Sequence, residues 1–224
     1  FGADLAVAYN FTSTFVVQQL YADLKYRCLG VSVGSKEKHS EFNNPLLSSG
    51  GLTFSGNARP IPQVRIGIPE YTVVPGTKGW LAFKGHIAYG IFTDDGWQKN
   101  FVAPGNKYTE HVLYHSKDLY VKIGNQEKFP LILEGGLEMA AQFGGNAFIG
   151  NEKIDMPNGI KDFFKVFIPS GGSSDTPLGE QLNIYGNHLG SWNFSLTWYA
   201  PKNWTIRPYY EHYFEDHSQM FGDY

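Results

Sequence analysis

The acidic and aromatic side chains of residues 93–116 are the ones in this sequence best suited to bind a ligand. Asp94 and Asp95 stand close to Trp97. Carboxylates accept hydrogen bonds from pairs of sugar hydroxyls, and an indole ring stacks on the C–H face of a sugar. The same segment adds further polar and aromatic groups at Gln98, Tyr108, Tyr114 and His115. The cluster predicts a saccharide-binding site, although the tip of any exposed hairpin could carry the same residue types.

Glu134 and Glu138 share one face of a predicted strand, which raises the question of a paired-carboxylate mechanism. Four residues of a strand span about 13 Å, and that is too far for the two carboxylates to act on one bond. A network of paired charges on the polar face of the sheet is the better interpretation. Its basic members would be Arg65, Lys84, His86 and Arg207. We expect Arg65 or Lys84 to contact Glu134 or Glu138, because ions in a confined space must pair.

Other catalytic and metal-binding patterns are weak. His111 and His115 are four residues apart and could hold a metal only in a helix, but their segment has no clear period. Cys28 is the lone cysteine, which excludes an intrachain disulfide and a multi-cysteine metal site. No serine has the sequence context of a nucleophile. We therefore expect no catalytic activity, no metal and no cofactor.

Composition limits the class of protein before any motif is considered. Aromatic residues make up 16% of the chain and charged residues 17%, while the mean hydropathy is -0.29. A β-barrel that alternates lipid-facing and water-facing residues has this composition. No apolar run reaches the length of a membrane-spanning helix, and the start of the sequence does not resemble a signal peptide. The net charge of -3 provides no basic surface for nucleic acid.

The elements that must position these residues are strands, since apolar residues recur at every second position in run after run. The runs cover residues 14–26, 63–68, 80–92, 119–124, 131–142, 192–199 and 206–214. Every Asp, Glu, Lys and Arg in them falls on one face. The opposite face, with Leu81, Phe83, Ile87, Leu133, Leu137, Phe194 and Leu196, is predicted to contact lipid. A soluble β-sandwich also alternates, but several of these runs exceed the usual length of its strands.

Short and long connections alternate between the runs, which is typical of outer-membrane barrels with short periplasmic turns and long extracellular loops. The long connections cover about residues 36–60, 93–116 and 144–187. In the last of them, Ile160, Phe163, Phe164 and Phe167 have helical spacing, Asn158 could cap the start and Pro169 forbids continuation. We expect residues 1–224 to form one all-β domain, a transmembrane antiparallel β-barrel with a short helix in an extracellular loop.

Several separated blocks resemble the capsule assembly Wzi family. They include Arg59–Ile66, Gly79-Trp80, Phe83–His86, Tyr114–Lys117, Leu137–Met139, Gln142–Gly145, Asp162–Lys165 and Glu215–Ser218. The resemblance extends over about residues 1–220. It implies a monomeric barrel of about 18 strands in a Gram-negative outer membrane, a lectin that holds capsular or exported polysaccharide and has no catalytic activity. About nine strands can be counted here, so we expect the sequence to be roughly half of such a barrel, a fragment of a longer chain.

The predicted function is binding of capsular or exported polysaccharide at the outer membrane. The partners would be the polysaccharide, the lipid bilayer and possible further outer-membrane assembly proteins, without nucleic acid. The alternative is a porin or transport channel, which would need an open lumen. An outer-membrane enzyme is a third class, and it would need a nucleophile beside a base, which the sequence does not supply.

Overall fold

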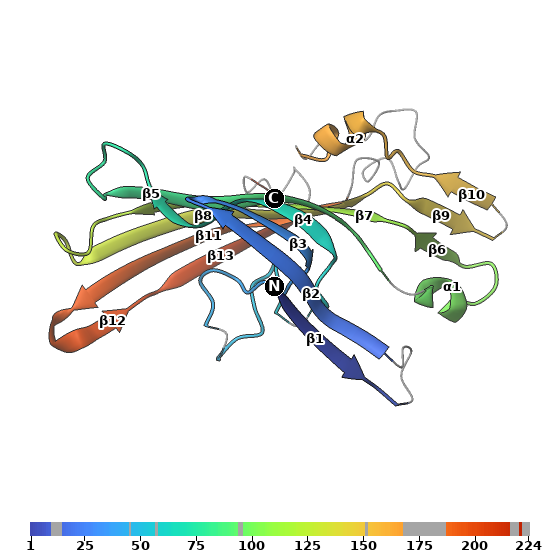
Figure 1. The fold of residues 1–224 in the computed structure, drawn as a ribbon, viewed down its shortest axis with the longest axis horizontal. Coiled ribbons are helices and arrows are strands. Elements are labelled where there is room, and N and C mark those ends of the chain that lie inside the picture. The colour runs from blue at the N-terminus through green and yellow to red at the C-terminus, as the bar shows by residue number, and fades with distance from the viewer. Residues whose placement is uncertain are drawn as a thin grey trace.

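The fold is mostly antiparallel β-sheet with a few short helices, which confirms the all-β prediction. The computed structural model describes residues 1–9, 15–44, 46–56, 58–93, 96–150, 152–167, 187–215 and 220. Ten strands form the main sheet (Figure 1). They are β1 (Gly2–Val7), β2 (Phe15–Tyr26), β3 (Leu29–Ser35), β4 (Gln63–Val73), β5 (Leu81–Ile91), β7 (Leu113–Ile123), β8 (Leu131–Phe143), β11 (Asn187–Ala200), β12 (Trp204–Ile206) and β13 (Tyr209–Glu215).

From β1 to β12, each strand of the main sheet lies beside the next strand of that sheet in the sequence. The strands that intervene in the sequence belong to a second sheet. The order is β1-β2-β3-β4-β5-β7-β8-β11-β12, and β13 pairs with β11 as well. Because β12 and β13 pair with successive parts of β11, they occupy a single position at that edge. Within the described residues, β1 and the β12–β13 position each have a partner on one side alone, so the sheet does not close into a barrel.

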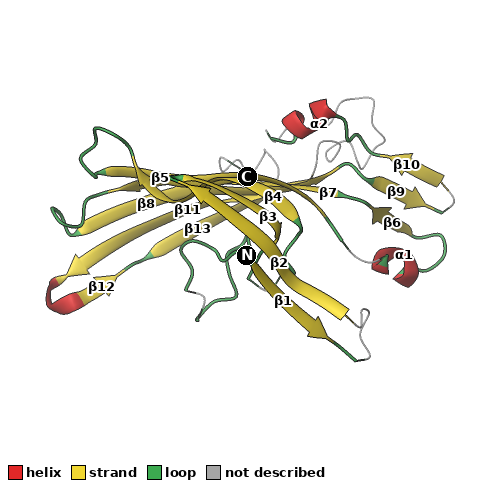
Figure 2. Cartoon of the chain, in the orientation of Figure 1, coloured by secondary structure: helices red, strands yellow, loops and turns green. Residues whose placement is uncertain are grey.

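A small second unit lies beyond one end of the main sheet, and we call it the rim unit. It contains α1 (Trp97–Phe101), β6 (Lys107–Glu110), β9 (Asn146–Ile149), β10 (Glu152–Asp155) and α2 (Ile160–Lys165). Its three strands form a sheet in the order β10-β9-β6. The helices of the described chain lie at the two ends of the main sheet, with the 3₁₀ turn η1 (Pro201–Asn203) opposite the rim unit (Figure 2).

The connections have the predicted alternation. Residues 27–28, 74–80, 124–130 and 201–203 link strands at the end away from the rim unit, whereas residues 36–62, 92–112 and 144–186 link them at the rim end. The turns at the far end use left-handed backbone, for example at Arg27 and Lys202. Since paired antiparallel strands must reverse at alternate ends, this pattern gives the sheet a short-turn end and a long-loop end.

Most predicted runs are strands, and the limits of several differ from the prediction. β7 begins at Leu113, six residues before the predicted run. The run 206–214 is two strands, and Pro208 lies between them because it has no N–H for the ladder. The start of α2 is capped at Gly159 and not at Asn158, so that prediction was wrong. Asp162 takes over the capping role, since its Oδ2 accepts a hydrogen bond of 2.8 Å from the Gly159 N–H.

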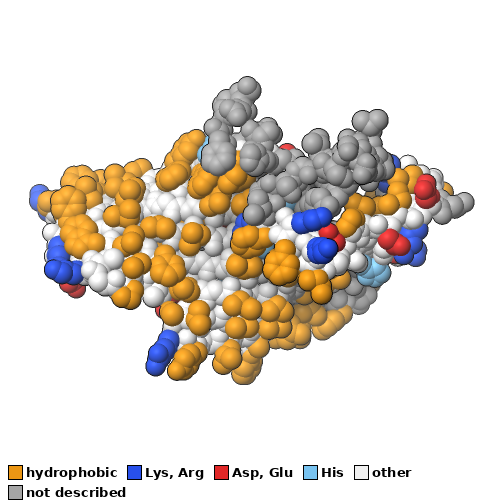
Figure 3. Space-filling view, turned by 90° about the horizontal axis from the view of Figure 1, so that it is seen from above, with side chains coloured by type: hydrophobic (Ala, Val, Ile, Leu, Met, Phe, Trp, Pro, Cys, Tyr) orange, Lys and Arg blue, Asp and Glu red, His pale blue; other side chains and the backbone are white. Residues whose placement is uncertain are grey.

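The two faces of the main sheet differ in chemistry as predicted. The sheet curves so that β1–β2 and β12–β13 bend toward the same side (Figure 1). On the convex face, Ile87, Leu133, Phe194 and Leu196 are exposed. Figure 3 shows hydrophobic side chains over the middle of this face and most of the visible charged side chains toward its margins. On the concave face Glu138 is fully buried. None of the helices in the described part of the chain has both the length and the apolar character needed to cross a membrane.

Candidate functional site

The concave face is covered by the long connection that follows β3. Residues 36–44 and 46–56, which we call the inward loop, run back beneath the sheet and do not project from its end (Figure 1). Phe42 is buried and its ring meets the ring of Tyr120 edge-on, with 5.5 Å between centroids. Arg207 Nη2 donates a hydrogen bond of 2.7 Å to the Phe42 carbonyl. The inward loop therefore packs on the middle of the concave face.

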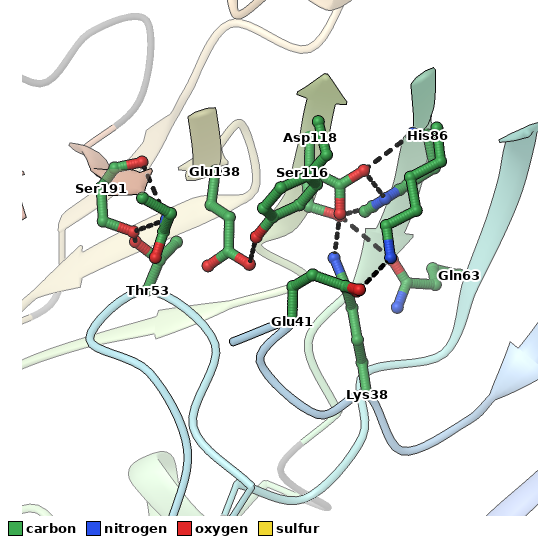
Figure 4. A network of polar contacts seen from close by, with 12 residues as sticks. Lys38, Glu41, Thr53, Gln63, His86, Ser116, Asp118, Glu138 and Ser191 are labelled. Atoms are coloured by element: carbon green, nitrogen blue, oxygen red, sulfur yellow. Dashed lines mark hydrogen bonds and ion pairs between the residues drawn. The ribbon is translucent and has the colours of Figure 1, made fainter. Parts of the chain in front are cut away.

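Ion pairs attach the first half of the inward loop to β5 and β7. Lys38 pairs with Asp118 of β7, and Glu41 pairs with Lys84 of β5. Asp118 also accepts a hydrogen bond of 2.9 Å from the His86 backbone N–H, and the His86 Nδ1 lies 2.8 Å from the same oxygen. Figure 4 shows Lys38 and Glu41 reaching from the loop toward these strands. Lys38 and Glu41 of the loop are thus each matched to an opposite charge on the sheet.

Hydrogen bonds attach the second half of the inward loop to β11 and β13. Thr53 Oγ1 donates to Ser191 Oγ at 2.8 Å, and the Leu52 N–H donates to Glu211 Oε1 at 2.8 Å. Ser191 Oγ also accepts from the Asn193 side chain at 2.9 Å. The loop thereby connects strands that are several positions apart in the sheet.

The predicted charge network exists in a different form, and the expected contact of Arg65 or Lys84 with Glu134 or Glu138 was wrong. Lys84 pairs with Glu41 of the loop, and Glu138 accepts a hydrogen bond from the Tyr120 hydroxyl. Glu134 accepts one of 3.2 Å from Ser195. The reason is that the inward loop brings its own charges to the face, whereas the sequence argument considered strand residues alone.

A cavity of about 340 Å³ opens beside the inward loop, over β2–β5 and β7. Its lining holds five basic side chains (Lys25, Lys36, Lys38, Arg65 and Lys84) and four acidic ones (Asp23, Glu41, Glu70 and Asp118). Each acidic group pairs with one of the lysines. Arg65 is the remaining cation; within the described residues no carboxylate pairs with it, and its buried Nε has no hydrogen-bond partner. The cavity can therefore accept a polar or anionic group.

The predicted saccharide cluster is divided between the rim unit and the main sheet. Asp94 and Asp95 lie outside the described residues. Trp97 in α1 is 46% exposed and stacks on Phe101, with 5.0 Å between the ring centroids. Tyr108 in β6 stacks on Phe148 of β9 at 4.7 Å.

Gln98 is already engaged within the rim unit. Its Oε1 accepts hydrogen bonds from the backbone N–H and the hydroxyl of Thr109 at 3.2 and 3.3 Å. This contact fixes α1 on β6 and so orients Trp97, one residue earlier in the same helix. Gln98 thus positions α1, and its predicted contact with a sugar stays a prediction.

Tyr114 and His115 are not loop residues, which corrects their predicted place in the cluster. Both belong to β7 and point to opposite faces, because side chains alternate along a strand. His115 is buried, with its ring 4.5 Å from that of Tyr89 and its Nδ1 3.0 Å from the Ala88 carbonyl. The strand also removes the helical spacing that a metal site at His111 and His115 would need. Among the described residues no group of three or more candidate ligands could hold a metal ion.

Lys38, Glu41 and Asp118 dominate the concave site and were not predicted from the sequence. Asp118 precedes the predicted run at 119 by one residue, so extending that run would have placed it on the polar face. The charges at Lys38 and Glu41 were visible in the sequence, but nothing in a loop sequence shows that the loop folds inward.

No family model, curated protein or solved structure matches this chain.

Proposed function

We propose that this chain forms part of the wall of an outer-membrane β-barrel that binds capsular or exported polysaccharide at the cell surface. The observation that carries the proposal is that the main sheet buries polar side chains and exposes apolar ones, the reverse of a soluble sheet. Leucine, isoleucine and phenylalanine side chains are exposed on the convex face, while charged and polar side chains are buried on the concave face. A lipid environment stabilises this arrangement, because apolar groups leave water and the ionic groups stay enclosed.

Strand length supports a membrane-spanning wall. β4, β5, β7 and β8 have 11 to 13 residues, and tilted strands of about 9 to 11 residues cross a bilayer. A sheet with open edges is unstable in lipid, since each unpaired backbone group there costs several kcal/mol. Closure of the proposed barrel would need strands beyond the nine positions that the structure describes, and the barrel of about 18 strands that the resemblance implies would supply them.

The rim unit offers the chemistry of a sugar site at the long-loop end. Its exposed aromatic pair, Trp97 and Phe101, presents flat faces on which the C–H faces of sugar rings can stack. Gln98 holds this helix in place. If the long-loop end faces outward, as in other outer-membrane barrels, the aromatic pair is on the extracellular side where exported polysaccharide would meet it.

A diffusion channel is less well supported than a binding protein. The inward loop covers the concave face and is fixed to β5, β7, β11 and β13 through ion pairs and hydrogen bonds. An open channel would need this face to line a continuous water-filled path. Planar-bilayer conductance of the full polypeptide distinguishes the two functions, and large stable currents would favour the channel.

The test of polysaccharide binding uses Trp97→Ala in the full polypeptide. Loss of one stacking surface should weaken binding by about 1 to 3 kcal/mol, as for other ring-stacking contacts. Trp204→Ala is the matched control, because Trp204 is an exposed tryptophan at the short-turn end. The measurement is retention of purified polysaccharide by the folded protein. A second variant with Asp94→Ala and Asp95→Ala tests the predicted carboxylates.

Equal retention by the wild type, Trp97→Ala and the Asp94/Asp95 variant would remove the rim unit as the site. Absence of polysaccharide binding by the unaltered protein would overturn the function itself.

A further inference from the structure

The convex face has a hollow at Gly85 that its main chain keeps open. Gly85 points to this face between Phe83 and Ile87, and a Cβ added there would lie 2.4 Å from the Asp118 carbonyl oxygen. The neighbouring strand therefore approaches too closely for any side chain at this position. The result is a hollow of about 360 Å³. Apolar side chains make up most of its lining, among them Ile66, Ile68, Phe83, Ile87, Leu119 and Leu137.

A single lysine lies at this hollow, on a face of β7 whose other side chains are apolar except for the buried His115. Lys117 lies in β7 on the same side as Leu119, Val121 and Ile123, and it pairs across the sheet with Ile87 and Met139. Its Nζ lies 4.1 Å from the centre of the Phe167 ring, just after α2. In the part of the chain that the structure describes, no carboxylate forms an ion pair with Lys117.

The adjacent aspartate does not neutralise this cation. Asp118 points to the concave face, where Lys38 and His86 engage it. A cation that faces hydrocarbon without an anionic partner is costly, and long basic side chains in membranes are stabilised by lipid headgroups. Lys117 is the fifth of the eleven residues of β7, and on its long-loop side His115 is buried beside Phe167. The exposed apolar part of this face therefore begins at Leu119, and Lys117 lies at its border, where lipid headgroups would meet it.

We propose that the Gly85 hollow and Lys117 form a binding site for an anionic membrane lipid, whose phosphate pairs with Lys117 and whose acyl chain lies in the hollow. The inference rests on the proposed function in one respect, namely that the convex face contacts lipid. Both parts of the site lie well inside the sheet, on strands whose neighbours are all described. Closure by further strands at the edges therefore leaves the site unchanged.

The experiment measures lipid association with the full polypeptide in mild detergent by native mass spectrometry. Phosphatidylglycerol and phosphatidylcholine with identical acyl chains are the probes, since one is anionic and the other is zwitterionic. Wild type should prefer phosphatidylglycerol by about fivefold, which corresponds to one basic residue near a headgroup. Lys117→Gln should lose this preference, and Lys117→Arg should keep it.

The matched control is Lys122→Gln. Lys122 is in the same strand but on the concave face, over the Tyr71 ring, so its loss should leave the preference unchanged. Ile87→Trp fills the hollow and should weaken retention of both lipids, which tests the acyl-chain part of the site separately.

A Lys117→Gln variant that keeps the wild-type preference would overturn the lipid site. Failure of the proposed function gives a different result. In that case spin labels at Leu119 and Phe194 would report water at the convex face, and neither lipid would be retained by any variant.

Discussion

The two faces of the main sheet share the same strands but have opposite burial. In β7, Leu119 is 54% exposed, whereas its neighbour Tyr120 is 2% exposed. In β8, Leu133 on the convex side is exposed and Glu138 on the concave side is fully buried. A soluble sheet buries its apolar face and exposes its charges. Backbone pairing therefore fixes only the alternation of side chains between the two faces. The surroundings of a face decide which side chains are stable on it.

Specific contacts order the whole concave face, whereas on the convex face they are confined to the rim end, where Phe163 of α2 packs on Tyr89 and Phe143. Tyr120, Glu138, Asp118 and Lys84 each have a named partner, and the inward loop supplies several of these. The exposed leucines and isoleucines on the convex face are stabilised by an apolar environment. Substitutions that exchange the character of the two faces should therefore have unequal effects.

The largest effect should come from a charge on the convex face. Leu137 pairs with Leu119 on one side and Trp192 on the other, which places it in the interior of the sheet. Leu137→Arg should lower the free energy of unfolding by about 2 to 4 kcal/mol if the position lies near the middle of the bilayer. Urea titration of the full polypeptide in lipid vesicles measures this cost.

Leu137→Met is the control for this variant, because it keeps the apolar character and changes the volume little. A cost for Leu137→Arg below about 0.5 kcal/mol, the range of ordinary surface substitutions, would mean that water and not lipid covers this face.

The next largest effect should come from the buried hydrogen bond on the concave face. Tyr120→Phe leaves the buried Glu138 carboxylate without its hydroxyl partner, and this should cost about 2 to 3 kcal/mol in the free energy of unfolding. Replacing Glu138 by Gln in the same chain removes the uncompensated charge, so the double variant should recover part of the loss. A double-mutant cycle measured by urea titration gives the cost of Tyr120→Phe and the part of it that Glu138→Gln recovers. Additive costs would show that the two side chains do not interact.

The periodicity of the sequence predicted the sheet and its two faces because strands impose a period of two on side chains. Leu133, Leu137, Glu134 and Glu138 lie on the expected faces for this reason. The break before Tyr209 and the early start of β7 were missed. The first depends on the missing N–H of Pro208, and the second on a strand segment whose apolar face is interrupted by Lys117.

The partners of the charged residues could not be predicted in the same way. Lys84 was placed on the polar face by its alternation, but its partner Glu41 belongs to a loop, as does Lys38, the partner of Asp118. Loop conformation depends on contacts between residues far apart in sequence, such as the hydrogen bond from Arg207 to Phe42. The same limit applies to Tyr114 and His115, because their place in a strand separated them from Trp97.

The smallest effect concerns two ion pairs of the concave face that differ in exposure. Lys38 and Asp118 are largely enclosed between the inward loop and the sheet. Lys25 and Glu70 form a pair of 2.7 Å whose side chains are exposed to solvent. Lys38→Gln should lower the free energy of unfolding by about 1.5 kcal/mol, the value of a hydrogen bond to a charged group. Lys25→Gln should change it by less than about 1 kcal/mol, because water and salt screen an exposed pair.

The same two variants also separate attachment of the loop from overall stability. Since Lys38 joins the inward loop to β7, Lys38→Gln should increase the rate of protease cleavage within residues 36–56, and Lys25→Gln should leave that rate unchanged. Added salt should weaken the exposed Lys25–Glu70 pair, as Lys25→Gln does. It should weaken the enclosed Lys38–Asp118 pair less, because that pair is screened less. Equal cleavage rates in the two variants would mean that the Lys38–Asp118 pair does not hold the loop, and the hydrogen bonds to Ser191 and Glu211 would then carry its attachment.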